Sequence, residues 1–314
     1  MVQTNAQGLD HARSKVLDGE GERLLPSIQA SDEHERMRLL ACPACGGTRH
    51  RFLYTKDKCD IVRCEDCGLG RTLTSSFDPN DYYTGDYFSG KRADGYADYL
   101  GAEPVLRREF AGTVQFIRNF RPSGRLLEVG CAYGFLLQVA RRDFEVAGIE
   151  LAEDAAEHCR RSGLAVTTGQ ADESLLKQFG LFDVIVMLDV IEHLQSPGET
   201  VALLARHLTP GGIIVITTGD FGSLSARLAG ARWRLMTPPQ HLWFFSQASM
   251  RQMAAARGLE VAYLDHPWKV VPLSLIHFQL ARMIGLHLRK VPTWGGVGVP
   301  VNLFDAMRVV LRKP

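Results

Sequence analysis

Apolar runs of strand length recur along the chain from about residue 120 and alternate with stretches of helical periodicity. The strand-like runs are 126–129, 146–149, 165–168, 184–188 and 213–217. The helical patterns between them include 135–142, 153–161 and 200–207. Strands that alternate with helices in this way form a parallel sheet covered by helices on both faces. The pattern therefore predicts an α/β fold with a doubly wound, mostly parallel sheet.

The first of these strands ends in a glycine-rich turn. Glu128, Gly130 and Gly134 follow the spacing Glu-x-Gly-x-x-x-Gly, and Glu150 closes the next strand about twenty residues later. Glycine has no Cβ, so a ligand can approach the backbone closely, and an acid after the second strand can bind both ribose hydroxyls. Because position 132 is alanine, the dinucleotide fingerprint is incomplete, and the spacing favours S-adenosylmethionine over a pyrophosphate. Taken alone, the turn is equally consistent with a tight strand-to-helix connection that binds nothing.

Two downstream segments extend this pattern. The strand 184–188 is followed at once by Asp189-Val-Ile-Glu192-His193, and the segment 208–212, Leu-Thr-Pro-Gly-Gly, precedes the strand 213–217. In order and spacing, these segments and the glycine turn resemble the motifs of class I S-adenosylmethionine-dependent methyltransferases.

The resemblance covers about residues 105–314 and implies a seven-stranded sheet with a final antiparallel strand, a place that residues 301–312 fit. It also implies that S-adenosylmethionine is the cofactor. The residues expected to contact it are Glu128, Gly130, Cys131, Tyr133, Gly134, Glu150, Leu151, Ala171, Leu188 and Asp189.

Four of the seven cysteines form two CxxC pairs near the N-terminus. Cys42 with Cys45 and Cys64 with Cys67 are separated by 18 residues, and each pair is followed by glycine. This spacing is typical of a zinc ribbon in which two turns direct four sulfurs at one tetrahedral ion. Four thiolates leave no coordination position for water, so we expect a structural Zn²⁺. Two redox CxxC motifs, or ordinary buried thiols, are the alternatives.

Charge and composition limit the class of partner. The 36 Lys and Arg residues nearly balance the 35 Asp and Glu residues, so no overall basic field favours nucleic acid. The N-terminus lacks a basic segment followed by an apolar stretch, and no apolar run of about 18 residues suggests a membrane span. We therefore expect a cytoplasmic protein that acts on a small molecule.

The sequence divides into four parts: a flexible arm (1–36), the zinc ribbon (37–76), an aromatic linker or lid (77–104), and a methyltransferase domain (105–314) with a helical insertion near 272–290. The linker is rich in tyrosine, which suits either packing onto the core or a lid over a polar ligand. The insertion has an apolar helical face and is expected to cover the acceptor pocket, with dimer or membrane-surface contact as alternatives. Trp233 and Trp243 are candidates for lining the acceptor site or for packing in the core.

Methyl transfer from a sulfonium requires an aligned acceptor and, for a hydroxyl or carbon acid, a base. His193 and His241 both follow strands at the ligand-binding edge, and imidazole titrates near neutrality, so either is a candidate catalytic base. Sugar C-methyltransferases with a zinc ribbon, which this chain resembles, use histidines at matching positions. Gln240 replaces the acid of that family's Glu-His pair, and its additional C-terminal domain has no counterpart here.

Resemblance to ubiquinone-pathway O-methyltransferases implies a different arrangement, in which Asp189, Glu192 and His193 hold a divalent ion. The function expected from the sequence is O-methylation of a sugar or another specialised metabolite. Carbon methylation of a nucleotide-linked deoxysugar is the nearest alternative. An RNA-directed or carrier-protein-dependent methyltransferase, and a non-catalytic cofactor-binding protein, are the others.

Overall fold

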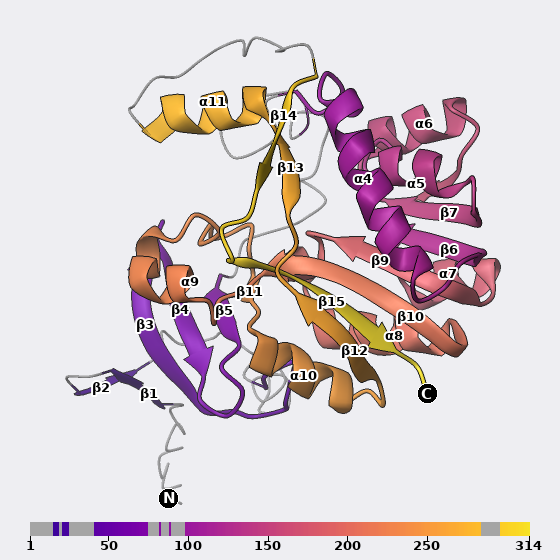
Figure 1. Ribbon diagram of the computed structural model, residues 1–314. Helices are drawn as coiled ribbons and strands as arrows, with labels where there is room; N and C mark the ends of the chain where they lie inside the picture. The colour runs from indigo at the N-terminus through magenta and orange to yellow at the C-terminus, as the bar shows by residue number, and fades with distance from the viewer. Residues whose placement is uncertain are drawn as a thin grey trace, which may run out of the picture.

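The computed structural model describes residues 15–18, 21–24, 41–74, 82, 88, 98–283 and 296–314. A large sheet flanked by helices lies beside a smaller sheet, and a two-stranded ladder with one helix extends beyond both (Figure 1). Most of the expected arm (1–36) and most of the expected linker (77–104) lie outside the described residues.

The large sheet has seven strands in the order β12-β15-β10-β9-β6-β7-β8. Their bounds are Gly124–Val129 (β6), Phe144–Glu150 (β7), Ala165–Thr168 (β8), Phe182–Leu188 (β9), Leu208–Gly219 (β10), Glu260–Asp265 (β12) and Ala306–Arg312 (β15). Strands β10, β9, β6, β7 and β8 pair in parallel, whereas β15 runs antiparallel between β10 and β12. This topology confirms the α/β fold and the final antiparallel strand expected from the sequence.

Helices cover both faces of the large sheet. Their bounds are Glu103–Arg118 (α4), Phe135–Ala140 (α5), Glu153–Arg161 (α6), Glu173–Phe179 (α7), Pro197–Arg206 (α8) and Gln247–Ala255 (α10), and a short 3₁₀ turn at Ile191–His193 (η1) follows β9. The helix Leu224–Ala229 (α9) and the 3₁₀ turn Gly230–Arg232 (η2) lie beside the smaller sheet instead (Figure 1). Along β9, Val184 and Val186 pack with α4, α5 and α6, while Ile185 and Met187 pack with α7, α8 and α10. Successive side chains of a strand face opposite ways, so burial on both faces explains its uninterrupted apolar sequence.

The smaller sheet contains the expected zinc ribbon and has the order β11-β5-β4-β3-β1-β2. Its strands are Lys15–Asp18 (β1), Gly21–Leu24 (β2), His50–Lys56 (β3), Cys59–Cys64 (β4), Gly70–Leu73 (β5) and Trp243–Phe244 (β11). The last of these comes from the methyltransferase part of the chain. Cys42, Cys64 and Leu69 also belong to the same buried cluster as Leu127 and Ile185 of the large sheet. The ribbon and the large sheet therefore share a core.

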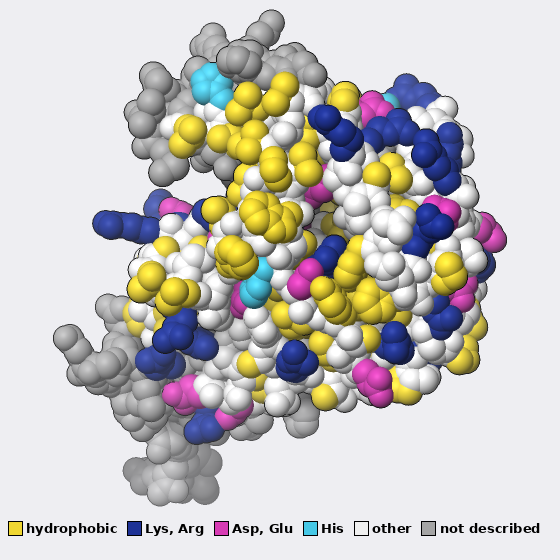
Figure 2. Space-filling view, viewed as in Figure 1, with side chains coloured by type: hydrophobic (Ala, Val, Ile, Leu, Met, Phe, Trp, Pro, Cys, Tyr) yellow, Lys and Arg dark blue, Asp and Glu magenta, His cyan; other side chains and the backbone are white. Residues whose placement is uncertain are grey.

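An antiparallel ladder of Lys269–Pro272 (β13) and Gly298–Val301 (β14) flanks the expected insertion (272–290), whose described part is mainly the helix Leu273–Met283 (α11). Beyond Met283, its expected remainder falls outside the described residues. Exposed hydrophobic side chains gather on this part of the face in Figure 2. Trp268, Leu280 and Val297, which lie in or beside β13, α11 and β14, are exposed. In the described parts of the chain, no helix is long and apolar enough to cross a membrane.

Candidate functional site

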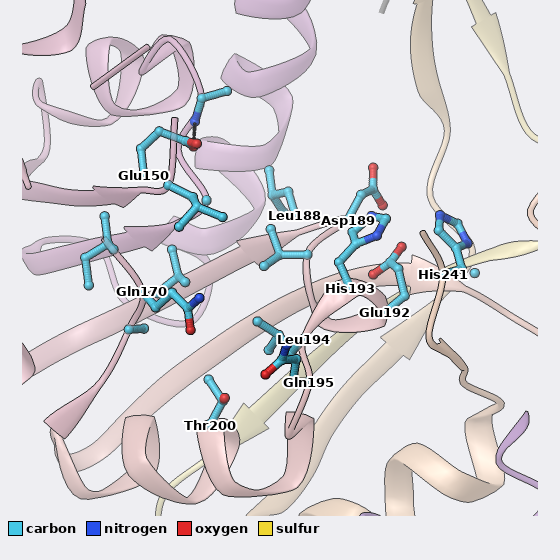
Figure 3. A pocket seen from close by; sticks show the side chains of 18 of the residues that line it. Glu150, Gln170, Leu188, Asp189, Glu192, His193, Leu194, Gln195, Thr200 and His241 are labelled. Atoms are coloured by element: carbon cyan, nitrogen blue, oxygen red, sulfur yellow. Dashed lines mark hydrogen bonds between the residues drawn. The ribbon is translucent and has the colours of Figure 1, made fainter. Parts of the chain in front are cut away.

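A cavity of about 510 Å³ follows the carboxyl ends of the parallel strands. Its lining residues come from the segments after β6, β7, β8 and β9, and from the loop before β11. In Figure 3, Glu150 and Gln170 lie toward one end, and Glu192, His193 and His241 lie toward the other. The cavity thus joins the expected cofactor end to the expected acceptor end, as the rule for open parallel sheets predicts.

The glycines of the turn after β6 are required by close packing. Gly130 has φ +74°, and a Cβ there would lie 2.6 Å from a methyl carbon of Val190. Gly134 also has φ +74°, and its Cβ would lie 2.6 Å from Leu164 Cδ1 and 2.8 Å from Cys159 Sγ. A side chain at either position would be strained by the backbone conformation and would collide with a neighbour. The spacing Gly-x-x-x-Gly therefore brings the turn close to β9 on one side and to α6 on the other.

Glu150 is the last residue of β7, and its carboxylate holds the turn after β6 through a hydrogen bond. Its side chain is 5% exposed; Oε2 accepts a hydrogen bond from the backbone N–H of Ala132 at 2.7 Å, and Oε1 accepts from the N–H of Ala152 at 2.9 Å. Burial raises the pKa of Glu150, and these backbone hydrogen bonds partly offset the effect. Each carboxylate oxygen has a second lone pair, so the side chain, which lines the cavity, can still accept ribose hydroxyls.

The structure separates the ten residues expected to contact the cofactor into two groups. Those that line the cavity are Gly130, Glu150, Leu151, Ala171, Leu188 and Asp189. Within the described residues, Glu128, Cys131, Tyr133 and Gly134 are buried around the turn and are not part of the lining. Burial raises the pKa of Glu128 well above its ordinary range. These four residues support the turn from behind.

Aromatic rings close the cofactor end. Phe88 and Tyr99, from the expected linker, both line the cavity, and their ring centroids lie 5.5 Å apart in an edge-to-face contact. Tyr99 also stacks on Phe135 at 5.5 Å, and Phe88 meets Tyr133 edge-on at 5.4 Å. Phe88 and Tyr99 therefore pack on the core and also line the cavity, and a lid over a polar ligand stays a prediction.

The two candidate bases lie together at the acceptor end. The ring centroids of His193 and His241 are 4.7 Å apart. His193 Nδ1 lies 2.9 Å from the carbonyl oxygen of Gln240, which can only accept, so Nδ1 carries the proton and Nε2 is the basic nitrogen. Burial lowers the pKa of His193 to about 4 and that of His241 to about 3, the latter also through repulsion from His193. Both imidazoles are therefore neutral near pH 7.

Glu192 lies beside this pair and is 4% exposed. Burial, reinforced by the charge of Asp189, raises the pKa of Glu192 to about 8, so its carboxyl group is mostly protonated at neutral pH. Among the described residues, its Oε2 has no hydrogen-bond partner. Potential ligand atoms of Glu192, His193 and His241 all lie within 4.8 Å of one another. Two imidazoles and one carboxylate form a donor set that suits a divalent transition metal.

This trio differs from the metal ligands that the resemblance implied. The carboxylate of Asp189 accepts hydrogen bonds from Lys269 at 2.6 Å and from the hydroxyl of Thr217 at 2.9 Å. Desolvation raises the pKa of Asp189 even though its side chain is 44% exposed, but the Lys269 charge and these hydrogen bonds outweigh that effect and hold the pKa below its usual range. Among the described residues, the side chains whose ligand atoms lie close together here are those of Glu192, His193 and His241, and Asp189 is not one of them.

Two cationic residues of the site were missed by sequence reasoning. Lys269 and Arg234 both line the cavity, the first paired with Asp189 and the second in a double hydrogen bond to Asp305 at 2.7 and 2.8 Å. Lys269 begins strand β13 and Arg234 lies in the loop before β11, and neither belongs to a motif, so only the fold reveals them.

The two tryptophans proposed for the acceptor site belong to the core. Trp233 Nε1 donates to Asp305 at 3.0 Å, and Trp243 Nε1 donates to the carbonyl of Leu194 at 2.8 Å. Both side chains are buried, and within the described part of the chain neither lines the cavity. The same is true of α11, whose described residues are absent from the lining, whereas Lys269 of β13 is part of it. Lys269 precedes the expected insertion, so covering of the acceptor end by the insertion stays a prediction.

The expected zinc site is assembled. Cys42 and Cys67 have their sulfurs 3.5 Å apart, and Cys45 and Cys64 have theirs 3.6 Å apart. Tetrahedral zinc with Zn–S bonds of about 2.3 Å requires sulfur separations of about 3.8 Å, so the four cysteines fit one ion with little adjustment. The remaining cysteines, Cys59, Cys131 and Cys159, are buried free thiols.

Comparisons with known proteins agree with this geometry. A family model described as a methyltransferase domain matches residues 104–264. Among curated relatives, a ubiquinone biosynthesis O-methyltransferase of Caulobacter sp. (strain K31) is 31% identical over 150 residues, covering 44% of this chain and 60% of its own. A second one, from Methylococcus capsulatus, is 32% identical over 155 residues, covering 45% of this chain and 65% of its own. The chain therefore spans less than two thirds of the length of either.

A solved structure shares the fold. One chain from the complex between the Haloferax volcanii Trm112 methyltransferase activator and a candidate methyltransferase is 14% identical, with a TM-score of 0.50. The match covers 76% of this chain and 100% of the other. With the family model matching just over half of the residues, and with a seven-stranded sheet of the expected topology, the chain belongs to the methyltransferase domain family and has the class I fold.

Proposed function

We propose that this protein transfers the methyl group of S-adenosylmethionine to an oxygen atom of a small molecule. One observation carries the proposal: a single cavity joins the glycine turn and Glu150, the acid at the end of β7, to a pair of neutral imidazoles. Family membership supports the methyl donor, and the names of the two curated relatives support oxygen as the acceptor atom.

In this proposal the donor occupies the end of the cavity between Glu150 and the aromatic rings. Glu150 accepts the ribose hydroxyls, and Leu151, Gln170 and Ala171 surround the adenine. Phe88 and Tyr99 exclude water from above, which strengthens every polar contact inside. The sulfonium already makes the methyl carbon electrophilic, so these residues need only hold it in line with the acceptor.

The histidines serve the acceptor. As the acceptor oxygen forms its bond to the methyl carbon, the carbon–sulfur bond breaks, and S-adenosylhomocysteine is released. The acceptor hydroxyl gives its proton to His241 or His193, whose neutral rings can accept it. Burial lowers the pKa of both histidines, and the negative charge of Asp189 partly offsets this effect. The same charge stabilises the imidazolium as it forms. Protonated Glu192 can donate a hydrogen bond to the acceptor.

A divalent ion on Glu192, His193 and His241 is a second way to activate the acceptor. Such an ion would act as a Lewis acid that lowers the pKa of a bound hydroxyl, and it would use the same nitrogen lone pairs as the base mechanism. The two mechanisms are therefore exclusive, and metal dependence separates them. Two observations support a test of metal dependence: among the described residues Glu192 Oε2 has no hydrogen-bond partner, and the ligand atoms of the three side chains lie close together.

We further propose a sugar or another hydroxylated specialised metabolite as the acceptor. The acceptor end offers both charges, through Asp189 and Lys269, and hydrogen-bonding groups, through the histidines and Glu192. Such a lining suits a polar, hydroxylated molecule better than a purely apolar one. Carbon methylation of a nucleotide-linked sugar would use the same base and remains the alternative.

The first experiment is calorimetric titration of the zinc-loaded protein with S-adenosylmethionine and S-adenosylhomocysteine. We expect micromolar binding of both. A radiolabelled methyl donor is then offered with sugar nucleotides, with phenols, and with RNA, and the product is hydrolysed to distinguish oxygen from carbon methylation. Label on RNA alone would refute the small-molecule proposal, and absence of donor binding would support the non-catalytic alternative.

A further inference from the structure

The backbone that carries His241 is held between two other segments. On one side, the N–H of Leu242 donates to the carbonyl of Glu192 at 2.9 Å. On the other side, Thr72 of the ribbon strand β5 donates twice: its N–H to the carbonyl of Leu242 at 2.9 Å, and its hydroxyl to the carbonyl of His241 at 2.6 Å. The ribbon therefore contacts the main chain of a candidate catalytic residue directly.

The same contact continues as a sheet. Strand β11, which begins two residues after His241, pairs antiparallel with β5, so that Trp243 lies opposite Arg71 and Phe244 opposite Gly70. The guanidinium of Arg71 lies over the indole of Trp243 at 5.0 Å. The indole N–H of Trp243 in turn binds the carbonyl of Leu194, the residue after His193. Both histidines are thus connected to β5 through neighbouring residues.

Strand β5 is itself fixed by the cysteine cluster. Cys64 ends β4, and the turn to β5 is closed by hydrogen bonds from the N–H of Gly68 to the carbonyl of Cys64 and from the N–H of Cys64 to the carbonyl of Leu69. Cys67 lies inside this turn, three residues before β5 begins at Gly70. An ion bound by the four sulfurs would therefore hold the start of β5 to the rest of the ribbon.

Thr72 is well placed to transmit this order. It is 4% exposed and lies opposite Ile61 of β4, in a strand that stands between β4 and β11. Without the Thr72 hydroxyl, the carbonyl of His241 would lose a hydrogen bond at a partly buried position, which is unfavourable. The position of His241 therefore depends on this hydroxyl. This edge of the ribbon is occupied by the chain's own β11.

We infer that the zinc ribbon positions His241 in the acceptor end of the cavity, with Thr72 as the positioning residue. The inference rests on the proposed function, in which His241 acts on the acceptor. It gives the ribbon a role in the reaction without contact to donor or acceptor: zinc orders the start of β5, β5 presents the Thr72 hydroxyl, and the hydroxyl fixes the main chain of His241.

The test compares Thr72→Val, which removes the hydroxyl and keeps the shape, with Thr72→Ser, which keeps the hydroxyl. Thr55→Val is the matched control, because Thr55 lies in the same ribbon but donates to Asp60 within it at 2.6 Å. In protein labelled with ¹⁵N-histidine, we expect the ring signals of His241 to shift or broaden in Thr72→Val. They should stay at their wild-type positions in Thr72→Ser and Thr55→Val.

Kinetics and metal removal complete the test. With an acceptor in hand, Thr72→Val should lower kcat at least about tenfold and leave the donor KM unchanged. Extracting zinc from the wild type should move the His241 signals in the same direction. Should Thr72→Val fold poorly, hydrogen exchange of residues 237–244 in the wild type, with and without zinc, gives the same information. The inference would be overturned if neither the ring signals of His241 nor the hydrogen exchange of residues 237–244 changed on substitution of Thr72 or on removal of zinc.

The failure of this inference can be told from the failure of the proposed function. Donor binding by calorimetry tests the function, and the histidine signals test the positioning. If the protein binds S-adenosylmethionine but the His241 signals are unchanged in Thr72→Val, the proposed function stands and the positioning role of Thr72 is refuted. If the protein binds no donor but its His241 signals respond to zinc, the proposed function is refuted and the structural coupling between zinc and His241 stands.

Discussion

Burial sets the protonation states of the residues at the acceptor end, and Glu192 is the clearest case. Its folded pKa of about 8 lies above the ordinary value of 4.5, because the buried carboxyl is disfavoured as an anion. The folded state therefore holds a proton that the unfolded state releases. The stabilisation that Glu192 contributes to the folded state is fully present below the unfolded pKa and is lost as pH rises toward about 8. The histidines act in the opposite direction, since their lowered pKa values cost stability as pH falls from about 6.5 toward 4.

We therefore expect the melting temperature of the wild type to fall between pH 6.5 and 8.5, and Glu192→Gln to reduce that fall, since its amide does not ionise. Thermal unfolding across this range measures the difference between the two proteins. Glu199→Gln, a change of the same type at an exposed position on α8, is the control. Parallel pH curves for wild type and Glu192→Gln would show that Glu192 is not held protonated.

Donor binding is best tested at Glu150 with glutamine. Alanine would also remove the acceptors of the backbone N–H groups of Ala132 and Ala152, so a loss of binding could reflect a collapsed turn. Glu150→Gln keeps one acceptor oxygen and most of the shape but loses the charge. Hydrogen bonds to a charged group contribute about 1.5–3 kcal/mol, so donor affinity should weaken about ten- to a hundredfold. Calorimetry that finds wild-type affinity in a folded Glu150→Gln would exclude the ribose role.

At the residue scale, the sequence located the turn but not the directions of its side chains. Gly130 and Glu150 line the cavity as expected, whereas Cys131 and Tyr133 are buried away from it. Which side chain of a tight turn faces the ligand depends on backbone angles that a motif does not encode. Lys269 reaches Asp189 from a strand 80 positions later in the chain, a pairing that requires knowledge of the fold.

At the scale of elements, periodicity predicted the strands well and their ends less well. The run 165–168 coincides with β8, and all five strand-like runs lie within strands of the large sheet. Strand β10 begins at Leu208, earlier than the expected 213, because the Leu-Thr-Pro-Gly-Gly segment enters the sheet with a register shift between Leu208 and Ile213. Pro and Gly usually indicate a turn, and here they bend a strand instead.

The strand–turn–helix unit of the donor site makes a prediction about Gly134. Alanine there would adopt a left-handed conformation, which costs about 1–2 kcal/mol, and would press on Leu164 and Cys159. Gly163→Ala is a close control: Gly163 has φ +73°, and among the described residues nothing lies within 4 Å of its Cβ position. The difference between the two variants isolates the packing.

We expect Gly134→Ala to lose about 1–3 kcal/mol more unfolding free energy than Gly163→Ala, because inserted atoms strain a packed core by that amount. Urea unfolding followed by circular dichroism measures both. Donor affinity should also fall in Gly134→Ala alone. Equal losses in the two variants would mean that α6 moves aside, and that the close contact between turn and helix is dispensable.

At the scale of the whole molecule, the ribbon and the large sheet form one unit. Arg257, just after α10, donates to the carbonyls of Pro43 and Ala44 in the first cysteine turn and to that of Gly198 at the start of α8. The two parts also share a buried cluster. Composition and cysteine spacing predicted a small separate module, because spacing reveals the ligands of an ion and nothing about the surface on which the module packs.

Shared packing predicts how the protein responds when zinc is lost. Cys42→Ser removes one of the four sulfurs, and the buried cluster that contains Cys42 extends into the large sheet, so the loss should destabilise both parts together. A loss of even about 3 kcal/mol would lower the melting temperature by about 6–12 °C, in a single transition. Calorimetry with metal analysis tests this, and Cys59→Ser, a buried thiol of the same ribbon outside the cluster, should keep both zinc and melting temperature. Two separate transitions in Cys42→Ser, with the larger one at the wild-type temperature, would show instead that the ribbon folds and melts alone.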